Sequence, residues 1–482
     1  MSETAIKQDN QQNWQFLPIK DFAHTTSGGT PKRGIEEYYN GDVPWVKSGD
    51  LNDSQLNSVD EFITQLGLEK SSAKLFKSGT LLIALYGATI GRLSILNFEA
   101  ASNQAVCGIT LPENMDVKYV FYYLLSIRRK LISQGKGGAQ PNINQQIVKE
   151  TIIPLAPPEQ QKRIVAKIEE LFSHIDTGIE ALKKAKQLLK QYRQSVLKAA
   201  VTGELTKDWR EANKNKLEPA SQLLERIEKK KLEVYEEEVN KWNELTKKWG
   251  ESDNKEKKPG KPKISKNIEP LSDEEIGELH SLPAGWLWVK LSQVATKITD
   301  GEHFKPPVQD DGVYFLSAKD VRDEGVSFAN PLYISDETAA KALLRCNPES
   351  GDILIVSRGA TVGRMCVVNT DEVFCLLGSV ILIKGANGIN SEYLMNLMKS
   401  PDVNRKISTV SGATAQQAIY LRDIQHVAIP LCSLEEQEEI DLAVNKKTEA
   451  IFRLEKEIYT KLAMAEKNKQ SILASAFSGN IS

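Results

Sequence analysis

The chain contains an internal duplication, and this feature restricts its possible folds more than any other. The segment SGTLLIALYGATIGR at residues 78–92 returns as SGDILIVSRGATVGR at residues 350–364. A repeat of this length indicates two similar structural units in tandem. We therefore expect the 482 residues to form two half-molecules, each with its own globular part.

Two further pairs of segments show how each half is organised. IIPLAPPEQQKRI at residues 152–164 returns at 427–440, and QSVLKAAVTG at 194–203 returns as QSILASAFSG at 470–479. Both pairs have an offset of 276 residues, so the segments that join them have equal lengths. We predict five parts: a first globular domain at 1–157, a first long helix at 158–204, a charged helical and flexible linker at 205–280, a second globular domain at 281–433, and a second long helix at 434–482.

The two equal-length segments have the apolar spacing of long helices. Apolar residues recur at alternating intervals of four and three, as in helices that pack side by side. About forty helical residues would span about 60 Å. The predicted contact positions are Ile164, Ile168, Leu171, Ile175, Leu182, Leu189, Val196, Ile440, Val444, Ile451, Leu454 and Ile458.

Charge is distributed unequally over these two helices. Residues 158–203 have a net charge of +4, whereas residues 434–482 have a net charge of −2. Because both segments also present an apolar seam, we expect them to pair with each other as an antiparallel coiled coil. The alternative is that each helix packs only on its own globular domain.

The two globular parts have the same predicted plan. Apolar runs that are typical of strands occur at residues 81–86, 106–111, 352–357 and 379–384. Residues 117–132 and 391–398 are typical of helices. This mixture predicts the α+β class, with two tandem similar α+β domains that are each followed by a long helix.

Composition and motif searches restrict the class of function. The chain has 40% hydrophobic and 26% charged residues, as in soluble globular proteins, and its start lacks the apolar core of a secretory signal, so we expect a cytoplasmic protein without a membrane partner. The five cysteines lack metal-ligand spacing. No phosphate-binding loop, nucleophile elbow or nuclease-type acidic cluster is present, which predicts no catalytic residue, cofactor or metal in this chain.

Polar loops that contain glycines and cations recur in both halves. They include TSGGTPKR at 26–33 and QGKGGAQPNINQQ at 134–146, and later TDGEHFKPP at 299–307 and SGATAQQ at 411–417. Arg and Lys suit phosphates and guanine edges, Asn and Gln suit adenine edges, and glycine lets the backbone approach a phosphate. A single loop of this kind could be a plain turn, but the recurrence favours a binding function. The net charge of −2 means that such binding would depend on a few placed cations.

Together these motifs resemble the specificity subunit of bacterial type I restriction–modification systems. The likeness rests on GGTP followed by DVPWVKSGDL, on GATIGR and GATVGR, and on QPNINQQIVKETIIPLAPPEQQKRI. LPAGW, TDGEHFKPP and IPLCSLEEQEEI extend it over essentially the whole chain. The second copy departs from the pattern, because SGATAQQAI stands in place of the QPNI form.

The resemblance implies a DNA-binding subunit that is not itself an enzyme. Each globular domain would be a target-recognition domain that reads one half of a bipartite, asymmetric sequence in double-stranded DNA. The paired helices would set the spacer and dock two modification subunits, which would use S-adenosylmethionine to methylate adenine N6. Restriction subunits that use ATP and Mg²⁺ would then join. A tandem-domain scaffold or protein-interaction module is the alternative, and it explains the heptads but not the matched loops.

The loop residues then become candidate DNA contacts. Lys32, Arg92 and Arg364 are expected to bind phosphates. Base contacts are expected near Lys47, Lys136, Gln140, His303, Lys305, Lys319 and Arg358. The candidate set is Gly28, Gly29, Thr30, Lys32, Lys47, Arg92, Lys136, Gln140, His303, Lys305, Lys319, Arg358, Arg364 and Gln416.

Overall fold

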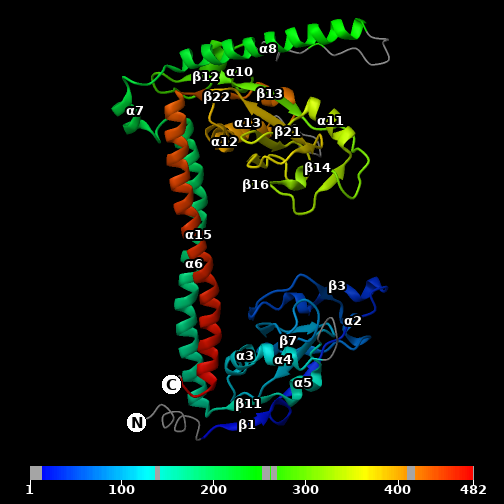
Figure 1. Ribbon diagram of the computed structural model, residues 1–482. Coiled ribbons are helices and arrows are strands. Elements are labelled where there is room, and N and C mark those ends of the chain that lie inside the picture. Colours follow the sequence, from blue (N-terminus) through cyan, green and yellow to red (C-terminus); the bar gives the residue numbers. More distant parts are fainter. Residues whose placement is uncertain (1–12, 136–141, 252–260, 262–268, 410–417, 481–482) are drawn as a thin grey trace. The chain divides into compact units, whose positions relative to one another are not determined.

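The computed structural model describes residues 13–135, 142–251, 261, 269–409 and 418–480 (Figure 1). The chain divides into two compact units. Unit 1 comprises residues 1–185 and 457–482, and unit 2 comprises residues 186–456. Unit 1 therefore combines the two ends of the chain, whereas unit 2 is continuous.

The globular part of unit 1 is built on two sheets and a two-stranded ribbon. Its elements are β1 (Gln15–Pro18), β2 (His24–Ser27), β3 (Tyr39–Val46), β4 (Ser54–Leu56), β5 (Phe62–Ile63), α2 (Gln65–Glu69), β6 (Leu75–Phe76), β7 (Leu81–Ala84), β8 (Leu93–Leu96), β9 (Ala100–Ser102), β10 (Val106–Thr110), α3 (Val117–Ser126), α4 (Arg128–Ser133), α5 (Gln145–Glu150) and β11 (Ile152–Leu155). The sheets have the orders β2-β10-β7-β8-β4 and β5-β3-β9-β6, and β1 pairs with β11.

The globular part of unit 2 repeats this plan. Its elements are β12 (Leu287–Lys290), α10 (Leu291–Val294), β13 (Ala295–Asp300), β14 (Val313–Leu316), β15 (Val321–Arg322), β16 (Gly325–Val326), β17 (Leu332–Ile334), α11 (Asp336–Arg345), β18 (Ile353–Val356), β19 (Met365–Val367), β20 (Phe374–Leu376), β21 (Val380–Gly385), α12 (Ser391–Lys399), α13 (Pro401–Thr409), α14 (Leu421–Gln425) and β22 (Ala428–Leu431). The order β13-β21-β18-β19 repeats β2-β10-β7-β8, and β17-β14-β20 repeats β5-β3-β9. The parallel pair β3 and β9 recurs as β14 and β20, so the duplication extends to strand direction.

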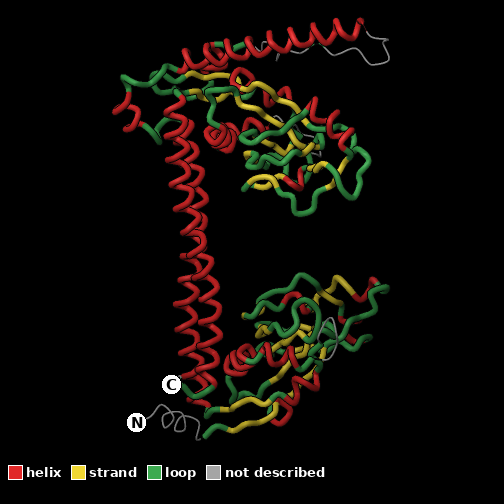
Figure 2. The backbone as a smooth tube through the Cα atoms, viewed as in Figure 1, coloured by secondary structure: helices red, strands yellow, loops and turns green. Residues whose placement is uncertain are grey.

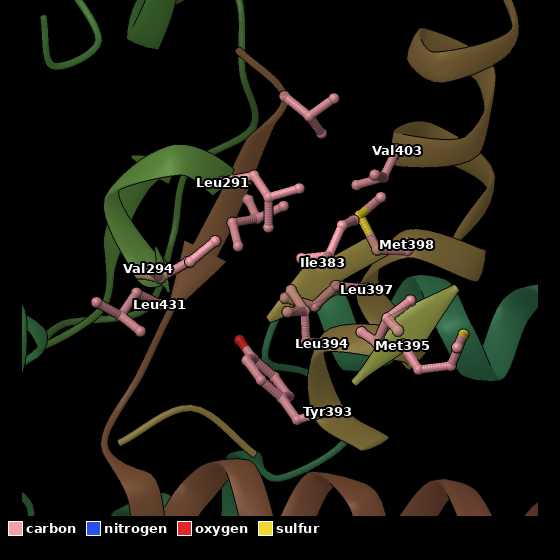
Figure 3. Packing of buried hydrophobic residues seen from close by; sticks show 14 of the residues in the cluster. Leu291, Val294, Ile383, Tyr393, Leu394, Met395, Leu397, Met398, Val403 and Leu431 are labelled. Atoms are coloured by element: carbon pink, nitrogen blue, oxygen red, sulfur yellow. The ribbon is translucent and has the colours of Figure 1, made fainter. Parts of the chain in front are cut away.

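The apolar runs of the sequence form the strands at the centre of each domain. Every residue of β7, LLIA, and of β18, ILIV, is buried, because each strand is covered on both faces. In unit 2 the side chains of Ile383, Leu394 and Leu397 pack together with Leu291 and Val294 (Figure 3). The mixture of helices and strands in both domains confirms the predicted fold class (Figure 2).

The described part of the linker adds three helices to unit 2. They are α7 (Lys207–Asn213), α8 (Ala220–Glu251) and α9 (Asp273–Gly277). Leu223 and Ile227 at the start of α8 are buried in the unit 2 core. The Lys231 ammonium donates hydrogen bonds to the carbonyls of Ser292 and Gln293, and burial lowers its pKa. The first part of α8 is therefore part of this domain.

The two long helices, α6 (Pro158–Val201) and α15 (Leu434–Phe477), pack together within each unit. In unit 1, Asp176 of α6 pairs with Lys469 near the end of α15. In unit 2, Arg193 near the end of α6 pairs with Glu455, at 3.3 Å. Early residues of one helix thus meet late residues of the other, so the pairing is antiparallel, as expected.

Most of the predicted contact positions lie on the buried side of these helices, with one difference. Buried positions are Ile164, Ile168, Val196, Ile440, Val444, Ile451 and Ile458, and half-buried ones are Leu171, Ile175, Leu182 and Leu189. The prediction places Leu454 in the helix contact, but its side chain is 47% exposed. The residue of α15 that faces α6 after Ile451 is Glu455 and not Leu454, since Glu455 forms an ion pair with Arg193 of α6.

Candidate nucleic-acid interface

The two glycines of the GGTP loop in unit 1 lie where the backbone is closely packed. Gly28 donates its N–H to the Val106 carbonyl and Gly29 donates to the Ser102 carbonyl, at 3.0 and 2.8 Å. A Cβ atom on Gly28 would lie 2.2 Å from the Ser102 carbonyl oxygen. Both N–H groups are therefore occupied, and close packing explains both glycines: Gly28 lets the loop approach Ser102 of β9, and Gly29 lets it approach Ser72 and Ala73.

The side chains that follow these glycines differ in availability. Thr30 donates a hydrogen bond from its hydroxyl to the Gln104 side chain. Lys32 is exposed and has no ion pair with any residue that the structure describes. Lys47 pairs with Glu61 at 2.7 Å, and this hydrogen bond raises the pKa of Lys47. Of these three residues, Lys32 is the cation that is free to contact an anion.

The GATIGR loop is held by an arginine that the sequence did not identify. Arg128 of α4 donates from Nε to the Gly91 carbonyl at 2.8 Å, and its Nη1 donates to Asp53 at 3.0 Å. Asp53 has a backbone φ of +63° and also accepts the Leu93 N–H. This clamp leaves the neighbouring Arg92 exposed, with only a 3.5 Å contact to the Leu51 carbonyl. Because Asp53 and Arg128 are far apart in the chain, no local pattern could have predicted the pair.

In unit 2 the GEHFKPP loop follows strand β13. His303 lies with its Nε2 atom 2.7 Å from Arg345 of α11, and Arg345 forms an ion pair with the largely buried Asp300. Lys305 is exposed, and no described residue forms an ion pair with it. The structure thus places His303 against a cation, Arg345, that the sequence analysis missed.

Three further candidates of unit 2 lie outside this loop: Lys319 in a short 3-10 helix, and Arg358 and Arg364 at the GATVGR loop. Lys319 pairs with Asp320 at 3.5 Å and donates to the Asn330 carbonyl, so its charge is partly compensated. Arg358 is exposed beside the GATVGR loop, and Arg364 at the end of that loop is half-buried. Neither arginine forms an ion pair with a described residue.

Lys136, Gln140 and Gln416 lie outside the described residues. Two of the described amides of the QPNINQQ motif, Asn144 and Gln145, have structural roles. Asn144 caps α5 by accepting the Ile147 N–H at 2.9 Å, and Gln145 donates to the Thr25 carbonyl at 2.7 Å. Asn144 thus starts α5 and Gln145 holds it against strand β2, so neither side chain is free to read a base.

Two hydrogen-bonded clusters at the starts of the long helices were also missed. In unit 2 the buried Glu436 accepts hydrogen bonds from Thr206, Arg210 and Trp286, at 2.8, 2.7 and 2.9 Å. In unit 1 the corresponding Gln160 accepts one from Trp14 at 3.1 Å. The recurrence of Trp in WQFLP and WLWVK, at 14 and 286, was the available signal.

Unit 1 also has a wide groove of about 1140 Å³ between α3 and the helical pair. Phe121, Tyr122 and Phe172 line it, and the ion pair of Lys118 with Glu169 crosses it at 2.7 Å. Burial raises the pKa of Tyr122, so this phenol is neutral at physiological pH. The groove joins a globular domain to the helices, but it has no free cation of the kind that a phosphate needs.

The described residues show no metal-binding cluster of three or more His, Cys, Asp or Glu side chains. All five cysteines are free and buried, and burial raises the pKa of Cys107 and Cys346 to about 12. These thiols are therefore protonated and packed as apolar groups. Among the described helices none is both long and apolar enough to cross a membrane.

Comparisons with known proteins identify one family of similar sequences. A family model described as "Type I restriction modification DNA specificity domain" matches residues 11–189 and 283–464. The type I restriction enzyme EcoBI specificity subunit of Escherichia coli is 26% identical over 384 residues, which are 79% of this chain and 69% of that protein. The EcoKI specificity subunit of Escherichia coli K12 is 22% identical over 98% of this chain and 89% of its own length.

A solved structure has a similar fold. It was determined in a study of complex assembly and conformational transition of the type I R-M system. The likeness covers 97% of this chain and 98% of that one, with a TM-score of 0.63 and 20% sequence identity.

Proposed function

The chain belongs to the family of type I restriction–modification DNA specificity subunits, and on this premise we propose how it reads DNA. Each globular domain contacts one half of a bipartite, asymmetric target in double-stranded DNA. The observation that supports this proposal is the matched pair of loops after β2 and β13. Each loop contains an exposed lysine, Lys32 or Lys305, that forms no ion pair with a described residue.

Phosphate and base contacts are divided among these loops. Lys32, Arg92 and Arg364 bind phosphates, because their side chains reach solvent from anchored backbone. His303, Lys305 and Arg358, which are exposed in unit 2, contact base edges. Lys47 and Lys319 first have to leave Glu61 and Asp320, so they contribute less to affinity.

The long helices are the spacer and the docking surface for two modification subunits. Apolar side chains on the solvent side of the helices support docking. In unit 2, Leu188 and Tyr192 are exposed one turn apart on α6, and Phe452 and Leu454 are exposed on α15. Such side chains are typical of protein interfaces. The modification subunits use S-adenosylmethionine to methylate adenine N6. Restriction subunits carry out the steps that use ATP and Mg²⁺. The complex acts in the cytoplasm.

Methylation mapping tests this function directly. The chain is co-expressed with a modification subunit that binds it, in a host that lacks adenine methylation. The methylated adenines are then mapped by long-read sequencing. We expect one bipartite motif, with one methylated adenine in each half and a fixed unread spacer. Methylation without a defined motif would contradict DNA reading by this chain and would favour the scaffold function.

A further inference from the structure

The loop after β13 carries an aromatic side chain that the proposed contacts do not use. The ring of Phe304 is 88% exposed, between His303 and Lys305. Because removing an aromatic ring from water is favourable, a ring that folding leaves in water can gain binding free energy when a partner covers it.

The backbone that carries Phe304 is anchored. Gly301 donates to the Val380 carbonyl, and Glu302 donates to the Leu376 carbonyl at 2.8 Å. The Glu302 carbonyl in turn accepts the Gly378 N–H at 2.7 Å. A Cβ atom on Gly301 would lie 2.0 Å from the Leu376 carbonyl oxygen, so the loop is pressed against β20. The contact of His303 with Arg345 fixes the next residue. The backbone position of Phe304 is therefore fixed before any partner binds.

The loop after β2 in unit 1 has the same anchors but a different side chain. Gly28 and Gly29 donate to Val106 and Ser102, which correspond to Val380 and Leu376 of unit 2. The fourth residue after the strand is Phe304 in unit 2 and the buried Pro31 in unit 1. The fifth is an exposed lysine in both. The duplication has thus kept the loop backbone and the cation and has changed the side chain between them.

We propose that Phe304 is a specificity-determining residue of unit 2, whose ring makes a direct apolar contact with bases of the half-site that this unit reads. The proposal rests on the proposed function. Lys305 gives the loop an uncompensated positive charge next to the ring, which suits a phosphate beside an exposed base. Aromatic side chains contact DNA either by inserting between base pairs or by packing against the thymine methyl group.

Binding measurements on the complex test the proposal. Phe304→Ala and wild type, each bound to the modification subunit, are titrated with the mapped duplex and with duplexes altered in either half-site. We expect the variant to bind the mapped duplex at least about tenfold more weakly and to discriminate less against changes in one half-site only. Affinity for unrelated DNA stays unchanged. Phe304→Trp restores most of the binding, because an aromatic ring is retained.

Phe16→Ala is the matched control, because Phe16 is 59% exposed in β1 of unit 1 and the same atoms are removed. We expect it to bind as wild type does. Equal losses on mapped and unrelated DNA, or no loss in Phe304→Ala, would overturn the proposal. A wild-type complex that recognises no motif would instead contradict the proposed function, so the two failures are distinguishable. Equal thermal midpoints of the variants exclude misfolding as the cause.

Two modified duplexes identify the kind of base contact. In the first, 2-aminopurine replaces single bases of the half-site, and its fluorescence rises where stacked bases are separated. If the ring inserts, the fluorescence rises with wild type but not with Phe304→Ala. In the second, uracil replaces single thymines. If the ring packs on a thymine methyl group, the replacement weakens DNA binding by wild type but not by Phe304→Ala. Either result supports the proposal. Wild type and variant responding alike to every substitution would contradict it.

Discussion

Glu436 is almost fully buried, and the guanidinium of Arg210 lies 2.7 Å from its carboxylate. Arg210 also donates to the Gly203 carbonyl and lies over the Trp286 ring, at 5.6 Å from its centroid. These contacts join the end of α6, the helix α7 and the start of α15 within unit 2. A buried carboxylate without its cation is costly, because the charge cannot be hydrated.

Arg210→Met should therefore destabilise unit 2 strongly. We expect a loss of about 3–5 kcal/mol in the free energy of unfolding, measured by urea denaturation. Glu436→Gln reproduces the neutral side chain of Gln160 in the first copy and should cost less. In the double variant, the glutamine should recover part of the Arg210→Met loss, since no charge stays buried. Additive losses in the double variant would show that the two groups are not coupled.

Arg92 is expected to act through a phosphate. Arg92→Ala should weaken the binding of all DNA sequences about equally and lower the slope of log affinity against log salt by about one unit. Arg163→Ala, which removes another exposed cation of unit 1 from α6, is the control and should leave the slope unchanged. Sequence-selective loss in Arg92→Ala would instead make Arg92 a base contact.

At the scale of elements, each long helix is fixed to its globular domain by a buried glutamine. Gln161 donates to the Ala156 carbonyl at 2.8 Å, and Gln437 donates to the Cys432 carbonyl at 3.0 Å. Gln437 also accepts the N–H of Asn390, the residue that caps α12. Because each amide joins a strand end to a helix start, it sets the direction in which the long helix leaves the domain.

Gln437→Leu should loosen this connection. The substitution leaves buried backbone donors and acceptors without partners, and we expect a loss of about 1–3 kcal/mol in the free energy of unfolding. Gln222→Leu is the control, since Gln222 is exposed near the start of α8. Thermal unfolding followed by circular dichroism measures both variants. Equal midpoints for Gln437→Leu and wild type would contradict the anchoring role.

The elements show what the sequence could and could not predict. The heptad spacing and repeat offsets predicted the paired helices and two equivalent domains, because these features depend on local periodicity. The exposure of Leu454 was not predictable, since the pairing of Glu455 with Arg193 joins distant parts of the chain. The packing of the loop glycines was also not predictable, because Gly28 approaches Ser102 and Gly29 approaches Ser72, and both are tertiary contacts. Likewise, the Asp53–Arg128 clamp exists only after folding.

At the scale of the whole molecule, the spacer hypothesis makes a quantitative prediction. Insertion of seven residues into both α6 and α15, at the boundaries after Ala185 and Lys456, keeps the heptad phase and adds about 10 Å of helix. At about 3.4 Å per base pair, we expect the unread spacer to lengthen by about three base pairs, with both half-sites unchanged. Methylation mapping measures the motif. New half-sites with the old spacer would contradict the hypothesis.

The shared anchors of the two domains have an evolutionary consequence. Tyr119 donates to the Pro154 carbonyl and Tyr393 to the Pro430 carbonyl, just as Gln161 and Gln437 occupy matching positions. The contacts that attach a domain to its helix are thus separate from the loop residues that differ, such as Pro31 and Phe304. Recombination within the anchor segments would exchange one domain for another without disturbing the attachment. A lineage could in this way acquire a new preference from one crossover and need not accumulate compensating substitutions.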